Sequence, residues 1–257
     1  MINPSNYIAF STIVRKEVTR FMRIWSQTLL PPVITQSLYF IIFGGFVGSQ
    51  IPAVNGVSYM AFIVPGLVMM AVINSSFQNV VSSFFGTKFQ RSIEELMVSP
   101  VPNSIIIAGY VIGGALRGIL VGAIVFLISL LFVQPQIFNL GWILLFVILT
   151  SVVFSLGGLV NAIFAKKFDD IAIFPTFVLT PLTYLGGVFY SIHRLPPFWQ
   201  NISKLNPILY MVDGFRYGFF GVADVNIGIS VGILLITTTL LAGLNYYLLE
   251  KGIGLKS

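Results

Sequence analysis

The side chains that could carry out chemistry in this sequence are few. The chain of 257 residues contains one histidine, His193, and no cysteine. Membrane zinc peptidases need two histidines close together on one helix, and thiolate chemistry needs cysteine, so neither is available. A Gly-x-Ser-x-Gly nucleophile elbow with a histidine base is also missing. The sequence therefore predicts a protein that is not an enzyme and that holds no cofactor or metal of its own.

The acidic residues argue against transport driven by protons or sodium. A carrier of that kind usually has a carboxylate deep in a membrane span to bind its coupling ion. Here every acidic residue falls in or beside a connection: Glu17, Glu94, Glu95, Asp169, Asp170, Asp213, Asp224 and Glu250. A Gly-x-x-x-x-Gly-Lys-[Ser/Thr] phosphate loop is missing as well. Uphill transport would therefore require a second polypeptide that binds the nucleotide.

One charged residue, Arg117, falls inside an apolar stretch, where Gly113, Gly114 and Gly118 flank it. An arginine within a membrane span is a functional candidate by default. It could instead extend toward the membrane surface, or hydrogen-bond a backbone carbonyl or Asn161. The sequence leaves these alternatives open.

The connection 87–103 combines apolar and charged residues in one short predicted helix. Ser92 and Glu95 have the spacing of a capping box, and Pro100 and Pro102 would end the helix. A helix of this kind could dock in a groove of a partner protein, or it could belong to an ordinary loop. Its apolar side would consist of Phe89, Ile93, Leu96 and Met97.

The segment 191–225 is too long for a tight turn and too apolar for a solvated loop. Proline groups interrupt it, and its helical part has half the length of a crossing, which predicts a re-entrant or interfacial helix and not a seventh span. Asp213 and Arg216 are three residues apart and could pair on one helix face. The segment could cap the bundle, or take part in gating. Together with Arg117 and Tyr190, the two charged residues are the candidates for the pathway or its gate.

The elements that would position these residues are membrane-spanning helices. Of all residues, 56% are hydrophobic and only 9% are charged, whereas soluble proteins carry about 25% charged residues. A hydrocarbon core about 30 Å thick requires roughly 20 apolar helical residues. We therefore predict an all-α integral membrane protein with six transmembrane helices, over residues 26–48, 58–85, 104–133, 140–164, 171–190 and 226–249.

The positions of lysine and arginine predict the orientation, because cytoplasmic loops are enriched in both. One side would carry only Arg194, Lys204 and Arg216. The other side would carry Arg15, Lys16, Arg20, Arg23, Lys88, Arg91, Lys166, Lys167, Lys251 and Lys256. Both termini are therefore predicted to be cytoplasmic, which requires an even number of crossings. The net charge of +6 thus reports topology and not binding of nucleic acid, since the basic residues form no single patch.

Residues 7–25 precede the first predicted span and alternate apolar with basic side chains. On a helix this pattern gives an apolar stripe, which predicts an amphipathic helix in the headgroup layer. A solvated basic leader is the alternative. Trp25 favours the interfacial helix, because tryptophan is enriched at membrane boundaries.

Short motifs along nearly the whole chain carry a family resemblance through their order and spacing. They lie at 21–25, 31–32, 63–66, 89–96, 168–170, 180–191, 195–199, 206–207 and 215–218. With these motifs the chain resembles the ABC type-2 transporter permeases, the membrane subunits of bacterial ABC exporters. The resemblance implies a single transmembrane domain over residues 1–257 in the bacterial inner membrane.

The resemblance also implies the partners. Two copies of the chain would form a pathway at their interface among membrane lipids, and two copies of a separate ATPase subunit would bind ATP and Mg²⁺ in the cytoplasm. The segment 87–103 would be the coupling helix, and the N-terminal helix would also contact the ATPase. A passive channel or a membrane assembly protein is the alternative. The residues expected at the ATPase contact are Phe89, Arg91, Ile93, Glu94, Glu95 and Leu96.

Overall fold

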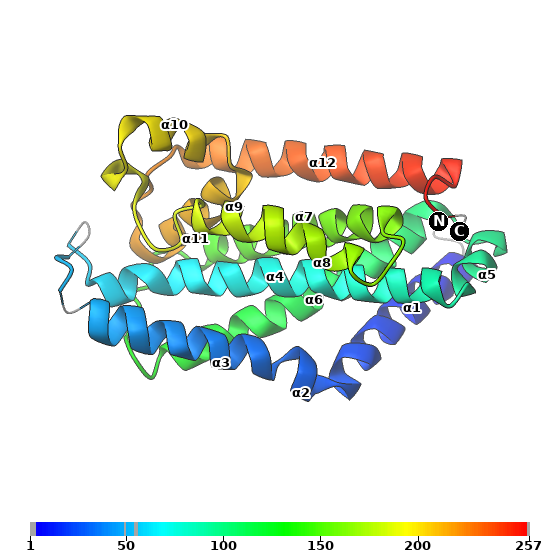
Figure 1. Ribbon diagram of the computed structural model, residues 1–257, viewed down its shortest axis with the longest axis horizontal. Helices are drawn as coiled ribbons and strands as arrows, with labels where there is room; N and C mark the ends of the chain where they lie inside the picture. Colours follow the sequence, from blue (N-terminus) through cyan, green and yellow to red (C-terminus); the bar gives the residue numbers. More distant parts are fainter. Residues whose placement is uncertain (1–3, 49, 54–55, 256–257) are drawn as a thin grey trace.

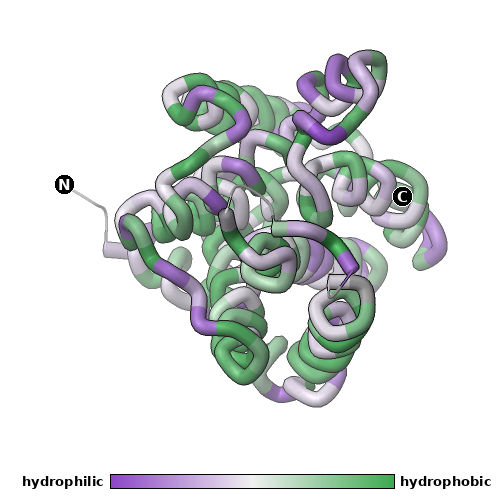
Figure 2. Tube along the Cα trace, turned by 90° about the vertical axis from the view of Figure 1, so that its left-hand side faces the viewer, coloured by the Kyte–Doolittle hydropathy of each residue, from purple (hydrophilic) through white to green (hydrophobic). Residues whose placement is uncertain are grey.

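The computed structural model describes residues 4–48, 50–53 and 56–255, and within this part of the chain it contains helices and no β-strand. Lys256, which the charge pattern places in the cytoplasmic tail, lies outside the described residues. The long helices lie side by side along the longest axis of the molecule (Figure 1). Seen end-on, they form a bundle whose hydrophilic residues concentrate in the connecting segments (Figure 2).

Five helical stretches of the described residues are long and apolar enough to cross a membrane. The first, Trp25–Phe46, combines α2 (Trp25–Thr28), α3 (Leu30–Tyr39) and most of a π-helical segment, η1 (Phe40–Val47). The others are α4 (Tyr59–Phe89), α6 (Asn103–Ser129), α7 (Leu140–Phe164) and α12 (Ile227–Lys251). They coincide with five of the six predicted spans.

The remaining predicted span, 171–190, is shorter in the structure. It consists of α8 (Asp170–Phe174), the π-helical η2 (Pro175–Leu179) and α9 (Thr180–Tyr184). The combined stretch Asp170–Tyr184 is shorter than the other five stretches and shorter than the roughly 20 residues that a crossing requires. The chain then turns at Gly187, whose φ of +74° suits glycine. Six crossings therefore remain a prediction.

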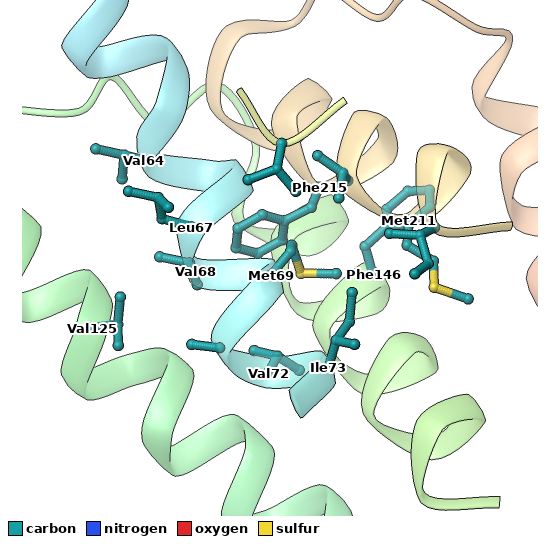
Figure 3. Packing of buried hydrophobic residues seen from close by; sticks show 14 of the residues in the cluster. Val64, Leu67, Val68, Met69, Val72, Ile73, Val125, Phe146, Met211 and Phe215 are labelled. Atoms are coloured by element: carbon teal, nitrogen blue, oxygen red, sulfur yellow. The ribbon is translucent and has the colours of Figure 1, made fainter. Parts of the chain in front are cut away.

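Helix α4 occupies the centre of the bundle and packs against α6 and α7. It begins at Ser58, whose side chain accepts a hydrogen bond from the Ala61 amide at 3.3 Å. Figure 3 shows its apolar residues facing Val125 of α6, Phe146 of α7 and Phe215 of α11 (Pro207–Phe220). Burial of these side chains positions the polar residues of α4 relative to the helices around it.

The two ends of the bundle carry different elements. The start of α1 (Pro4–Arg23), the short α5 (Ser92–Val98) and the end of α12 share one end (Figure 1). The opposite end carries the 3₁₀ turn η3 (Ile192–Arg194) together with α10 (Pro197–Lys204) and one end of α11.

Helix α5 exists where the sequence predicts a short helix, but the predicted capping box is wrong. Its N-cap is Arg91, in the left-handed conformation with φ of 61°. Ser92 is already inside the helix, and its hydroxyl donates to the Thr87 carbonyl at 3.2 Å. The chain turns sharply after α4, so the serine satisfies the end of α4 and not the start of α5.

Candidate coupling and pathway sites

The predicted coupling residues separate onto two sides of the α5 region. Ile93 is buried and packs with Phe84, Phe85 and Ile106, and Leu96 is half-buried against the same cluster. The residues exposed on the other side are Phe89, Arg91, Glu94 and Glu95. The apolar side of α5 thus contacts its own bundle, whereas the charged side and Phe89 remain accessible to a partner.

Two connections at this end of the bundle are joined into one unit. Lys88 donates from Nζ to the carbonyls of Ile163 at 2.6 Å and Ala165 at 2.7 Å, which satisfies the end of α7. The ring of Phe168 lies 4.8 Å from that of Phe89, measured between centroids. The end of α4 is therefore bound directly to the end of α7 and to the connection that follows it.

Asp170 fixes the connection between α7 and α8, which is the shorter of the two. Its carboxylate accepts hydrogen bonds from the backbone amides of Lys166 at 2.8 Å and Lys167 at 3.0 Å. These bonds stabilise the turn before α8, whose N-cap residue, Asp169, makes no side-chain cap hydrogen bond.

A groove of about 600 Å³ lies between the two connections and the C-terminal turn. Three of its lining residues, Lys88, Arg91 and Lys166, are cationic, so the groove combines positive charge with aromatic rings. The lining residues are Phe85, Lys88, Phe89, Arg91, Phe164, Lys166 and Gly254.

A carboxylate predicted to lie in a connection, that of Glu17, is buried at the contact of α1 with α4 and α6. Glu17 is fully buried and accepts hydrogen bonds from Ser83 and, at 3.2 Å, from Asn79. It also forms an ion pair with Arg20 at 3.2 Å. A Cβ at Gly113 of α6 would overlap the Glu17 side chain. The spacing of small residues on α6 was the signal that another helix approaches there.

Arg117 is buried at 7% exposure, and its Nη2 donates to the Thr28 carbonyl at 3.4 Å. The alternative of a backbone carbonyl partner is thus confirmed. No hydrogen bond joins Arg117 to the alternative partner Asn161 in the described part of the chain, and the Asn161 amide donates to the Ile171 carbonyl at 3.3 Å. The glycines beside Arg117 permit close helix packing: a Cβ at Gly114 would lie 2.6 Å from Val80 Cγ2 of α4.

On the outer segment, Asp213 and Arg216 do not pair as predicted, since the described residues show no ion pair between them within 4 Å. Asp213 instead accepts from the amides of Asp224 and Val225, each at 2.9 Å. Arg216 donates to the Gly187 carbonyl at 2.7 Å and lies 4.0 Å from the centre of the Phe62 ring. In the turns, backbone amides and carbonyls that have no partner within a helix lie nearer to Asp213 and Arg216 than the two side chains lie to each other.

The other outer candidate, Tyr190, donates from its hydroxyl to the Tyr184 carbonyl at 3.1 Å. Nearby, Asp224 accepts from the Ser191 hydroxyl at 2.7 Å and the Ile192 amide at 2.9 Å. These bonds tie the segment after α9 to the segment before α12. The contacts support the interpretation of segment 191–225 as a cap on the bundle.

The long apolar helices define a multi-pass membrane protein, and its family follows from comparison with known proteins. Residues 8–220 match the ABC-2 type transporter family, and the chain belongs to that family. It is 57% identical over 251 residues to the inner membrane transport permease YadH of Escherichia coli strain K12, with 98% of each chain covered. The resemblance stated from the motifs is thereby confirmed, and the protein is a multi-pass inner-membrane transport permease.

More distant relatives align over most of the chain as well. Nodulation protein J of Rhizobium meliloti strain 1021 is 22% identical over 232 residues, covering 90% of this chain and 88% of the relative. Nodulation protein J of Rhizobium leguminosarum bv. trifolii is 24% identical over 234 residues, covering 91% and 89%.

Proposed function

We propose that this permease is the membrane subunit of an ATP-driven exporter, which works as a homodimer with two copies of a separate ATPase subunit. The observation that carries the proposal is the position of α5. Its charged side is exposed next to the cationic groove, while Ile93 anchors its other side in the bundle. Such an element can receive a push from a partner and pass it to the membrane helices.

The proposed mechanism follows from these contacts. ATP-dependent closure of the partner dimer displaces α5 through Phe89, Arg91, Glu94 and Glu95. Because Lys88 joins the end of α4 to that of α7, both helices move with α5. ATP and Mg²⁺ are bound by the partner, and the N-terminal helix α1 provides a second contact with it.

The proposed topology has six crossings with both termini in the cytoplasm. The stretch Asp170–Tyr184 is the fifth crossing, and α10 and α11 are the short re-entrant helices of the outer side. The π-helical η2 and the nearby prolines, Pro175 and Pro181, give this crossing its irregular helix. Support comes from the shared location of α5 and the helix ends that carry the termini (Figure 1).

The test is the double variant Glu94→Ala/Glu95→Ala. The ATPase to co-express is a phosphate-loop protein encoded beside the permease. We expect the wild-type permease to retain this ATPase during purification and to show no ATP hydrolysis alone. The double variant is expected to lose the ATPase, or to abolish its response to the permease. Glu250→Ala removes an exposed acid outside α5 and serves as the control.

The outcomes separate the alternatives. Unchanged capture and unchanged hydrolysis in the double variant would show that α5 is not the contact. Substrate flux through purified permease in vesicles without any ATPase would favour the passive channel, and the exporter proposal would then fail.

A further inference from the structure

The central helix α4 carries a polar stripe on its one open side. Asn74 and Gln78 are exposed and Ser82 is half-buried, each one helical turn from the next, although α4 is otherwise buried nearly throughout. The Asn74 amide uses one donor on the Met70 carbonyl at 2.9 Å. An amide group that faces hydrocarbon without a hydrogen-bond partner costs about 2–7 kcal/mol. The stripe therefore requires water or a polar ligand.

Helix α1 carries a basic face beside this stripe. Residues spaced three and four apart line a cavity of about 490 Å³: Thr12, Arg15, Lys16, Thr19, Arg20, Arg23 and Ile24. Another face of α1 packs onto the bundle through Ile13, Glu17 and Phe21. Arg15, Lys16 and Arg23 are exposed, so the basic face points away from this packing surface and is open to water or anions.

Hydrogen bonds join the basic face to the stripe. Arg20 donates to the Ser82 hydroxyl of the stripe at 3.3 Å. Two further bonds reach buried residues of α4 beside the stripe: Arg20 donates to the side-chain oxygen of Asn79 at 2.8 Å, and Lys16 donates to the Thr87 hydroxyl at 3.4 Å. The stripe and the basic face thus form one surface, which begins at the cytoplasmic end of α4 and continues toward its middle.

The basic face has more positive charge than its surroundings neutralise. Within residues 4–48, 50–53 and 56–255 the ion pairs are Glu17 with Arg20 and Asp224 with His193. Arg15, Lys16 and Arg23 therefore have no acidic partner within 4 Å. Arginine and lysine side chains gathered in this way bind phosphate, sulfate or carboxylate groups through charge-assisted hydrogen bonds.

We propose that the basic face of α1 and the polar stripe of α4 form one hydrated groove that binds the anionic headgroup of a membrane amphiphile. The cations hold the headgroup, Asn74 and Gln78 offer it the next hydrogen bonds along the span, and its tail stays in lipid. The inference rests on the proposed function and adds the substrate class: an amphiphile with a phosphate, sulfate or carboxylate in its headgroup.

The first test measures hydration and uses the absence of cysteine from the natural chain. Gln78→Cys provides a single thiol in the groove, and Leu240→Cys provides a control on α12, where Leu240 is 68% exposed. Purified permease in phosphatidylcholine nanodiscs is treated with a charged, membrane-impermeant methanethiosulfonate. We expect Gln78→Cys to react and Leu240→Cys to stay unmodified. Equal resistance of the two thiols would overturn the hydrated groove.

The second test measures headgroup binding by native mass spectrometry of the purified permease with phosphatidylglycerol and phosphatidylcholine. Wild type is expected to retain phosphatidylglycerol in preference. Arg15→Gln/Arg23→Gln is expected to weaken this retention at least about tenfold, because each basic side chain near a membrane surface contributes about 1 kcal/mol. The control Lys204→Gln/Lys251→Gln removes the same charge at exposed positions outside this groove and outside the groove beside α5, and it is expected to retain the lipid. Equal losses in both double variants would overturn the site.

Glycerol phosphate added as a soluble competitor distinguishes the source of the anion. Retention of phosphatidylglycerol in its presence supports the membrane amphiphile, and displacement would overturn it in favour of a soluble phosphate compound. Neither test contains an ATPase. A failure here therefore leaves the coupling experiment on α5 unaffected, and a failure of that experiment leaves these two results standing.

Discussion

At the residue scale, the contacts of Glu17 fix the position of α1 against α4. A fully buried carboxylate is tolerated only where hydrogen bonds and a counter-charge compensate for its lost hydration. Glu17 has both, from Asn79 and Ser83 of α4 and from Arg20 of α1. The residue therefore fixes the rotation of α1 and, with it, the direction of the basic face.

We predict that Glu17→Ala destabilises the permease. The substitution leaves the Asn79 amide and the Ser83 hydroxyl without their acceptor, at a cost of about 1–3 kcal/mol for each buried group. The midpoint of thermal unfolding in detergent, followed by tryptophan fluorescence, should fall by several degrees. Glu17→Gln keeps one acceptor oxygen and should lose less, and Glu94→Ala, at an exposed position, should match wild type. An unchanged midpoint for Glu17→Ala would contradict the buried network.

At the element scale, the spans were predictable because an uninterrupted apolar run of sufficient length has few alternatives to a helix. Partners of single polar groups were not predictable in the same way. Spacing along a helix suggested that Asp213 pairs with Arg216, but the acceptors and donors nearest to them come from turns distant in sequence. Glu17 was taken for a connection residue because the small residues of α6 indicate that a helix approaches there but do not identify α1 as that helix.

The closeness of α4 and α7 gives a prediction with an internal control. A Cβ at Gly158 would lie 2.6 Å from the Phe77 carbonyl oxygen of α4, whereas a Cβ at the adjacent Gly157 meets nothing within 4 Å. Gly158→Ala should therefore destabilise by about 1–3 kcal/mol through overpacking. Gly157→Ala should be neutral or stabilise by up to about 1 kcal/mol, because alanine favours helix. The difference between the two unfolding midpoints measures the effect, and equal midpoints would show that the helices do not approach so closely.

At the scale of the whole molecule, the single chain leaves much apolar surface uncovered. The most apolar windows of Trp25–Phe46 and α12 are only 11% buried, against 89% for α4. Such helices suit contact with lipid or with a second copy, while α4 is surrounded by its own chain except along the polar stripe. Composition predicted a membrane protein correctly, but it could not show which helix lies at the centre, because all the spans are similarly apolar.

The number of crossings is the property of the whole molecule that the short stretch Asp170–Tyr184 leaves to experiment. With six crossings, residues at the α5 end and residues of α10 lie on opposite sides of the membrane. We predict that Asn201→Cys and Gln136→Cys, both at exposed positions, react with an impermeant thiol reagent added to cells whose outer membrane has been permeabilised. Gln90→Cys, exposed near α5, should react only after the inner membrane is opened as well.

The two outer thiols make the test specific to the fifth crossing. Gln136 precedes α7, so its side is fixed by the spans before it, whereas Asn201 follows Asp170–Tyr184 and changes side if that stretch fails to cross. Reaction of Gln136→Cys without reaction of Asn201→Cys in the same cells would mean five crossings. The C-terminus would then lie on the outer side, against the charge pattern of the connections. Equal reaction at both positions requires that this short, π-helical segment spans the membrane.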